Sequence, residues 1–241
     1  MLETSAQQNE KSDWIELKNS GINPAIFQKD NTADKLLEKF THPKQLFLKP
    51  QDVIYHEGAD ADAVYVISSG LVKLLRYLPN GRARIVRLHG PRHIVGLSGL
   101  IQPEYEHTAI ATNDAEIIKV PISFIKEIRN TNPEFYLELA EQWYHYLREA
   151  DLWITQFSTG SIRARVARLI IFLFFLEMEA NPGYVKLLPG EDMASILGVT
   201  PESVSRVMAE FKRKHIMEPV SVRNEILFKH DKIQLNELFM R

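Results

Sequence analysis

The order of apolar and polar positions divides the chain into a strand-rich part and a helical part that follows it. Between Gln45 and Val120, short apolar runs alternate with glycine and Asx turns, and Asn80-Gly81 separates two of the runs. Regular short strands are typical of a sandwich or barrel, and Asn-Gly between two of them predicts a tight hairpin. Apolar residues at helical spacing from Asn31 to Phe40 predict a short amphipathic helix ahead of the strands.

A long helix is predicted over residues 133–157, where apolar residues step by four and three. This heptad spacing is typical of an interface between two helices. The predicted seam consists of Tyr136, Ala140, Trp143, Leu147, Ala150, Ile154 and Phe157. A flanking stripe, expected to pack on the strand-rich part, consists of Phe135, Leu139, Tyr146 and Trp153. Burial of the helix within one chain is the alternative, but three sustained heptads favour a twofold homodimer.

The segment 191–216 has the pattern of two short helices joined by a tight turn. Gly198 is expected to end the first helix, because glycine readily takes the left-handed conformation at a helix C-terminus. Thr200 is the expected N-cap of the second helix, and Pro201 suits its first position. Its predicted buried face consists of Val204, Val207, Met208 and Phe211. This is the helix-turn-helix pattern, whose second helix presents its N-terminal residues to base edges in the major groove.

The side chains at the start of that second helix suit DNA. Glu202 and Arg206 are four residues apart and share a face, so Arg206 can fork onto a guanine while Glu202 accepts from a cytosine amino group. Downstream, alternation over residues 215–230 predicts a β-hairpin wing. The candidate DNA-contacting residues are Thr200, Glu202, Ser203, Ser205, Arg206, Lys212 and Arg223. An exposed ion pair on an ordinary helical hairpin is the alternative, against which the tight turn favours DNA.

A break in the helical pattern at Thr159–Ser161 predicts a hinge, and a further helix is expected from Ile162 to Glu179. Arg163, Arg165 and Arg168 at the start of that helix are candidate phosphate contacts. We expect an event in the strand-rich part to change how two long helices pack. The hinge would then convert this change into a reorientation of the DNA-reading helices.

Composition excludes several classes of protein. The chain has 241 residues, of which 45% are hydrophobic and 25% charged, as in an ordinary globular protein. It contains no cysteine, which excludes disulfides, thiolate-held zinc and iron-sulfur clusters. The polar N-terminus has no apolar signal core, and the longest apolar run, 169–176, is too short to span a bilayer. A cytoplasmic location without a membrane partner is therefore expected, and the absence of His-x-His, Gly-x-Ser-x-Gly and His-Glu-x-x-His disfavours an enzyme.

Taken in order, a glycine-punctuated β-roll, a long dimerisation helix and a winged helix-turn-helix resemble the Crp/Fnr family of bacterial transcription regulators over about residues 45–230. The matching β-roll residues are Gly58, Tyr65, Ile67 and Gly70. In PESVSR, the residues Glu202, Ser205 and Arg206 look like the E-x-x-S-R set of the Fnr and nitrogen-oxide-sensing branches. The resemblance implies an α+β fold, a homodimer on double-stranded DNA with TTGAT-like half-sites, and contact with RNA polymerase if the protein is an activator. It implies an N-terminal extension over 1–44, a β-roll sensor over 45–132, a dimerisation helix over 133–158 and a DNA-binding domain over 159–241.

The segment that matches the family's nucleotide pocket departs from the family pattern. Cyclic-AMP-binding members carry a glutamate for the ribose hydroxyl and an arginine for the phosphate, and here Leu97 and His107 take those positions. Ala150 and Asp151 take the helix positions that would meet adenine. Leucine cannot accept a hydroxyl proton and neutral histidine cannot fork onto a phosphate, so cyclic AMP is not expected to bind. The candidate effector pocket consists of Gly96, Leu97, Ser98, His107, Thr108 and Ala150.

The effector itself is left open by these residues. His89 and His93 are four residues apart and His107 belongs to the pocket, so a haem-based gas sensor of the same fold is one alternative. A lone histidine more often hydrogen-bonds within the fold. A small organic or anionic effector, or regulation without a ligand, is a further alternative. In a third, a β-roll module regulates a protein partner without binding DNA, and the role of Arg206 separates this alternative from the others.

Overall fold

The structure, a computed structural model, describes residues 31–40, 43–81, 83–176, 184–222 and 225–230. These residues form two units that divide between Ala150 and Asp151, inside the long helix. The domain boundaries expected from the sequence, after residues 44, 132 and 158, stay predictions. Each unit contains its own set of buried apolar residues.

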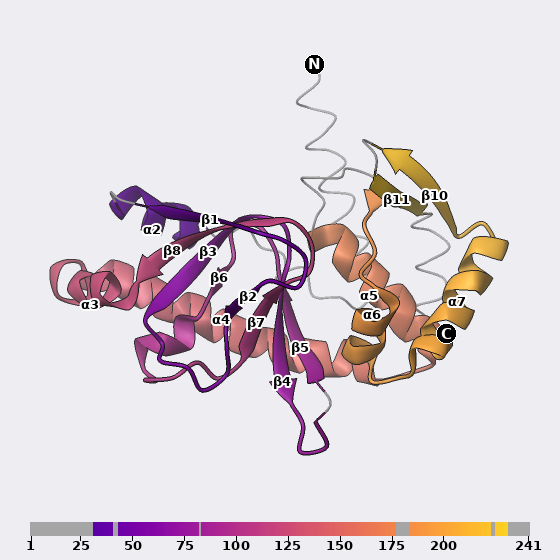
Figure 1. The fold of residues 1–241 in the computed structure, drawn as a ribbon, viewed down its shortest axis with the longest axis horizontal. Helices are drawn as coiled ribbons and strands as arrows, with labels where there is room; N and C mark the ends of the chain where they lie inside the picture. Colours follow the sequence, from indigo (N-terminus) through magenta and orange to yellow (C-terminus); the bar gives the residue numbers. More distant parts are fainter. Residues whose placement is uncertain (1–30, 41–42, 82, 177–183, 223–224, 231–241) are drawn as a thin grey trace. The chain divides into compact units, whose positions relative to one another are not determined.

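The first unit contains two four-stranded antiparallel sheets, with strand orders β1-β8-β3-β6 and β2-β7-β4-β5 (Figure 1). The strands are β1 (Lys44–Leu48), β2 (Val53–Tyr55), β3 (Ala63–Ser69), β4 (Val72–Tyr77), β5 (Ala83–His89), β6 (Ile94–Val95), β7 (Thr108–Ala111) and β8 (Ala115–Pro121). Every predicted run forms a strand, so the prediction of a β-rich sandwich or roll is confirmed. The two-residue strand β6 was not predicted, because a run that short shows no alternation.

Two glycines are required by the turns that join these strands. Gly81 has φ +76° and donates its N–H to the Leu78 carbonyl over 2.9 Å, which confirms the hairpin turn between β4 and β5. Gly70 has φ +82° between β3 and β4, and an added Cβ would lie 2.5 Å from the Asp114 carbonyl oxygen. A side chain at Gly70 would therefore force the β7–β8 turn away.

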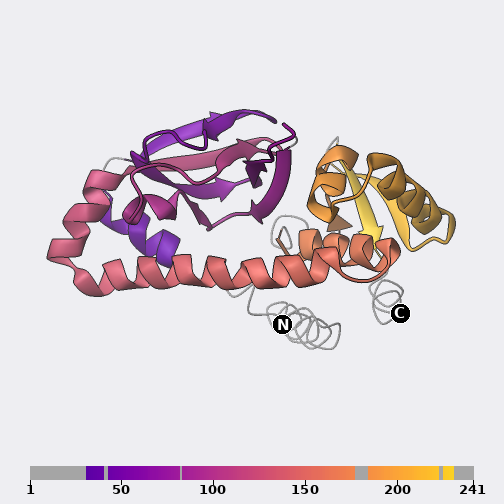
Figure 2. The ribbon, with the colours of Figure 1, turned by 90° about the horizontal axis from the view of Figure 1, so that it is seen from below.

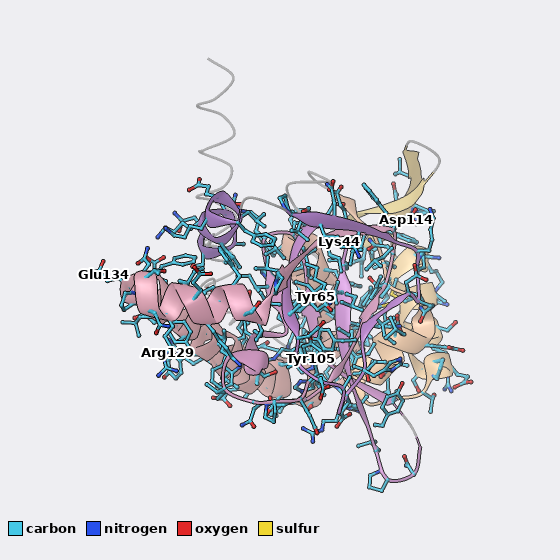
Figure 3. The ribbon with its side chains drawn as sticks, turned by 60° about the vertical axis from the view of Figure 1, so that its left-hand side comes forward. Lys44, Tyr65, Tyr105, Asp114, Arg129 and Glu134 are labelled. Carbon is cyan, nitrogen blue, oxygen red and sulfur yellow. The ribbon has the colours of Figure 1, made fainter. Side chains whose placement is uncertain are left out.

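The core of the roll lies between the two sheets. Tyr55 and Tyr105 stack there with ring centroids 3.8 Å apart, and the Tyr105 hydroxyl donates to the Ala63 carbonyl over 2.7 Å. Figure 3 shows Tyr65 and Tyr105 within the roll. The core consists of Tyr55, Ala63, Tyr65, Ile67, Val72, Leu74, Val95, Tyr105, Ala109 and Ile117.

Helices α2 (Thr32–Lys39), α3 (Ile122–Thr131) and α4 (Pro133–Ser158) form a second core against the sheet that contains β3 and β8 (Figure 2). Phe135, Leu139 and Tyr146 of α4 are buried in it, as their stripe predicts. The short helix predicted over 31–40 is confirmed as α2. The long helix predicted over 133–157 is confirmed as α4.

The second unit contains α5 (Ile162–Leu176), α6 (Gly190–Leu197), α7 (Pro201–Arg213) and a three-stranded sheet of order β10-β11-β9. The strands are β9 (Tyr184–Val185), β10 (Met217–Val222) and β11 (Glu225–His230), all antiparallel. The predicted helix pair and the hairpin wing are confirmed. The predicted end of α5 at Glu179 lies outside the described residues. None of the described helices combines the length and apolarity needed to cross a membrane.

Candidate DNA-binding helix and effector pocket

The turn between α6 and α7 has the geometry that its residues predict. Gly198 has φ +62° and ends α6, with its N–H donating to the Ala194 carbonyl. Thr200 then takes an extended conformation, and its hydroxyl accepts the Ser203 N–H over 3.4 Å. Pro201 occupies the first helical position. The cap satisfies one of the N–H groups that lack a partner at a helix start, and it sets the direction in which α7 begins.

One face of α7 is buried and the other faces solvent. Val204, Val207 and Phe211 are at most 5% exposed, while Met208 is only half-buried. The exposed side chains of the predicted DNA-reading set are Thr200, Glu202, Ser205, Arg206 and Lys212. Ser203 is half-buried, and its hydroxyl lies 3.2 Å from that of Thr200, so it belongs to the cap rather than to the open face.

Glu202 is directed toward the helix start more than toward Arg206. Its pKa is lowered chiefly because its own backbone N–H and the Thr200 hydroxyl donate to it, and the charge of Arg206 contributes least. No ion pair joins Arg206 to another residue in the part of the chain that the structure describes. The guanidinium on the exposed face is therefore available to a ligand.

Two further predicted DNA contacts concern the C-terminal side of the helix-turn-helix. Lys212 is exposed, and its ammonium lies 5.1 Å above the ring of Phe228 in β11. This contact links the recognition helix to the wing. Arg223 lies outside the described residues.

The three arginines at the start of α5 have protein partners, in contrast to the phosphate contacts that the sequence suggests. Arg163 pairs with Glu210 of α7 over 3.1 Å. Arg165 and Arg168 donate to backbone carbonyls at the end of α4. Arg165 and Arg168 are therefore engaged within the protein, because carbonyls at a helix end attract such donors, and their contact with phosphate stays a prediction.

The end of α4 also departs from its predicted seam. Phe157 is 3% exposed and packs edge-on against Trp153 and Phe172, with centroid distances of 4.8 and 5.7 Å. Phe157 is therefore not available to a second helix, and Trp153 packs on α5 rather than on the roll.

The open apolar face of α4 is displaced by one residue from the predicted seam at two positions. Tyr136 and Trp143 are partly buried against the core of the first unit, whereas Leu137 and Tyr144 are 58% and 59% exposed. Leu147 and Ile154 are exposed as predicted, and Ala140 and Ala150 are half-buried. The exposed stripe thus consists of Leu137, Tyr144, Leu147 and Ile154.

The predicted effector residues are largely engaged within the first unit. Gly96 has φ +85° and begins a 3-10 turn, η2 (Leu97–Leu100). Leu97 is 3% exposed and belongs to the core shared with α4. Thr108 is 1% exposed, and its hydroxyl accepts the Glu57 N–H over 3.0 Å. His107 and Ser98 are half-buried, and burial lowers the pKa of His107, so it is neutral at pH 7.

Two charged residues of the first unit, Arg87 and Glu149, were not predicted from the sequence. Burial raises the pKa of Glu149 in α4 to about 7, against the opposing charge of Arg87 in β5. Burial also lowers the pKa of Arg87. The signal that could have found Arg87 is its position between apolar residues of a predicted strand, which a charged residue occupies at a cost.

Two of the candidate haem ligands, His89 and His93, have partners within the protein. His89 is 2% exposed, and its Nδ1 lies 3.3 Å from that of His93. Both rings pack on Tyr146, whose hydroxyl accepts the Ile94 N–H over 3.0 Å. Burial holds the pKa of His89 well below its usual range. The described residues contain no cluster of three or more groups that could hold a metal ion, and this histidine pair fits an axial haem ligand poorly.

Two family models match the chain. The cyclic nucleotide-binding domain matches residues 45–132, and the Crp-like helix-turn-helix domain matches residues 164–236. The chain is 27% identical over 169 residues to the transcriptional regulator LdrP of Thermus thermophilus, covering 69% of this chain and 84% of LdrP. It is 29% identical over 156 residues to a cyclic AMP receptor protein of the same organism, covering 64% of this chain and 70% of that protein.

The fold is also similar to that of a solved structure. FixK2 from Bradyrhizobium japonicum superimposes with a TM-score of 0.71 at 22% sequence identity, covering 82% of this chain and 97% of FixK2. In this chain, the roll that matches the nucleotide-binding domain precedes a helix-turn-helix of Crp type. The chain therefore belongs to the Crp/Fnr family of DNA-binding transcription regulators, which are not enzymes.

Proposed function

We propose that this regulator acts as a homodimer that binds a palindrome of TTGAT-like half-sites and does not require cyclic AMP. The exposed Arg206 at the start of a capped recognition helix is the observation that carries the proposal. Arginine reads guanine through two acceptors in the major groove, and a single guanine occurs in each TTGAT half-site. Ser205 is exposed beside Arg206 and is short enough to reach a base or a phosphate.

The exposed stripe of α4 supports a dimer. Leu137, Tyr144, Leu147 and Ile154 are between 47% and 61% exposed, and their spacing follows the heptad repeat. Aligned apolar side chains of this size mark an interaction surface. A second copy of α4 is the partner that a heptad fits, and twofold symmetry would supply two recognition helices for the two halves of a palindrome.

Replacing Leu147 by aspartate is expected to raise the dimer dissociation constant by at least about tenfold, because a buried leucine contributes about 1.5 to 3 kcal/mol. Sedimentation velocity over a concentration series measures this constant. His145→Asp, at an exposed position on another face of α4, is the matched control and should leave it unchanged. Equal behaviour of the two variants would contradict an interface on this stripe.

The pocket residues argue against cyclic AMP as the effector. Leu97 is packed in the core, and His107 has no charge at pH 7 to neutralise a phosphate. Charged groups that act on His107 are Glu106, Arg76, Arg87 and Glu57. Glu149 adds a carboxyl that interacts electrostatically with Arg87, and its negative charge would oppose a nucleotide phosphate there.

Selection of bound sequences from random duplex DNA tests the proposal as a whole. We expect TTGAT-like half-sites in inverted repeat, with centres about 34 Å apart, one duplex turn. The same motif should be enriched with and without cyclic AMP. Enrichment only in its presence would overturn the independence from cyclic AMP, and single half-sites without a repeat would overturn the dimeric mode of reading. No enrichment at low salt in either arm would overturn DNA reading by Arg206.

A further inference from the structure

The corner between α4 and α5 is held by side chains of α5. Arg168 donates from Nη1 to the Gln156 carbonyl over 2.7 Å and to the Thr159 carbonyl over 2.8 Å. Arg165 donates from Nε to the Phe157 carbonyl over 2.8 Å. The Thr159 hydroxyl donates to the Thr155 carbonyl. Three of the last four carbonyls of α4 thus receive a side-chain donor.

The backbone of the corner is adapted to these donors. Gly160 has φ +84°, a conformation that other residues rarely adopt, and a Cβ there would lie 3.2 Å from Nη2 of Arg168. Ser161 then begins α5, since its hydroxyl accepts the Ala164 N–H over 3.3 Å. At the predicted hinge Thr159–Ser161, the Arg168 guanidinium group therefore lies against Gly160. Hydrogen bonds hold the backbone on both sides, at Thr159 and at Ser161.

We propose that Arg165 and Arg168 are positioning residues that make the α4–α5 corner a rigid elbow, so that the recognition helix follows the end of α4 as one body. This inference rests on the proposed reading of a palindrome by a dimer. It replaces the flexible hinge that the sequence predicts at Thr159–Ser161.

Electrostatics favours such an elbow. The C-terminal end of a helix carries partial negative charge, and charged donors make stronger hydrogen bonds to its carbonyls than neutral donors do. Two guanidinium groups at one corner repel each other, and burial together with the charge of Arg165 lowers the pKa of Arg168. The carbonyls of α4 offset this cost.

Packing extends the rigid body from the corner to the recognition helix. Trp153 and Phe157 of α4 contact Phe172 of α5 edge-on, at centroid distances of 5.6 and 5.7 Å. From α5, Arg163 reaches Glu210 of α7, which also pairs with Lys214 over 2.7 Å. The division of the chain inside α4 rather than at the corner agrees with this, because residues 151–158 group with α5 to α7.

A rigid elbow predicts strict dependence on the spacing of half-sites. One added base pair moves a half-site by about 3.4 Å and turns it by about 35°. The wild-type chain should lose at least about tenfold in affinity on palindromes lengthened or shortened by one base pair. Arg165→Lys and Arg168→Lys keep the positive charge but lose the guanidinium group and its several donors. These variants should bind the original palindrome less tightly than the wild type. Their affinities for palindromes of different spacing should differ by less than about threefold.

Salt dependence separates this role from phosphate binding. Removing a phosphate contact from both protomers would flatten the salt slope of the affinity by about 1 per contact, whereas the lysine variants should retain the wild-type slope. Lys212→Ala is the matched control, expected to flatten the slope without relaxing the spacing. The rigid elbow would be overturned if the lysine variants kept the wild-type selectivity for spacing. It would also be overturned if they changed only the salt slope of the affinity. A wild-type chain that binds no palindrome would instead overturn the proposed function.

A distance measurement keeps the proposal testable if the variants bind too weakly. Spin labels can be attached at Thr155→Cys in α4 and Ala209→Cys in α7, which are both exposed positions. Because the chain has no cysteine, no native cysteine has to be replaced first. Labelled chains diluted into unlabelled ones report the distance within one protomer. We expect a narrow distribution for the wild-type corner and a clearly broader one for Arg168→Lys. A broad distribution in the wild-type chain would overturn the rigid elbow.

Discussion

Replacing Arg206 by alanine is expected to weaken binding to a TTGAT palindrome by between about 30-fold and about 10⁴-fold. One bidentate contact to guanine contributes about 1 to 3 kcal/mol, and a dimer loses two of them. Arg206 is exposed, and its loss leaves the buried face of α7 intact, so the free energy of unfolding should hardly change. Fluorescence anisotropy with a labelled duplex measures the affinity, and thermal melts check the fold.

The source of the reduced affinity is tested on altered DNA. With the guanine of each half-site replaced, wild-type and Arg206→Ala chains should bind about equally, because the variant cannot make the guanine contact on either duplex. Arg213→Ala, at the far end of α7, is the control and should keep the preference for guanine. If Arg206→Ala weakened all duplexes to the same extent, Arg206 would contact phosphate rather than a base.

Replacing Glu149 by glutamine is expected to stabilise the first unit by about 3 kcal/mol at pH 8. The pKa of Glu149 rises from 4.5 to about 7 on folding, chiefly through burial, and each tenfold change in proton affinity corresponds to about 1.36 kcal/mol. Glutamine resembles the protonated carboxyl and carries no charge to bury. Urea unfolding at a series of pH values measures the difference, with the exposed Glu141→Gln on the same helix as control.

The sign of the pH dependence follows from the direction in which folding moves this pKa. A carboxyl whose pKa is raised binds its proton more tightly in the folded state, so its contribution is most favourable below pH 4.5. That contribution is lost as pH rises to about 7, and the advantage of Glu149→Gln should therefore grow over this range and then level off. A constant difference between variant and wild type across this range would show that Glu149 ionises as freely in the folded chain as in the unfolded one.

His89 affects the pH dependence of stability in the direction opposite to Glu149. The pKa of His89 is lowered chiefly by burial. Stability from a neutral His89 is present above pH 6.5 and is lost as pH falls below it. The Glu149→Gln chain, which lacks the opposing carboxyl, should therefore lose stability on acidification between pH 6.5 and 4.5 more steeply than the wild type.

Local patterns were sufficient where one segment decides its own conformation. Alternating runs with glycine turns predict the strands of the roll, because the side-chain period of a strand and the turn residues that end it are local properties. Gly198, Thr200 and Pro201 likewise predict the turn into α7, since a helix end is set by capping residues within a few positions. The exposure of Arg206 and the burial of Phe211 follow from the periodicity of a single helix.

Choices between neighbouring apolar positions required the tertiary structure. On α4, residues 136 and 137 are both apolar, as are residues 143 and 144. The heptad pattern fits either member of each pair, and packing on the core of the first unit turns Tyr136 and Trp143 inward and leaves Leu137 and Tyr144 exposed. Phe157 fits the heptad as well, but Trp153 and Phe172 cover it.

The sequence by itself determined a β-roll, a long helix and a helix-turn-helix with Arg206 on its open face. Only the tertiary structure decided which charged residues are used inside the protein. In the sequence, Arg165 and Arg168 have the pattern of solvent-facing arginines, but in the structure they donate to carbonyls at the end of α4. Glu149 has the pattern of an ordinary surface residue, but burial raises its pKa in the folded protein. Burial and hydrogen-bond partners come from segments far apart in the chain, and no local pattern contains them.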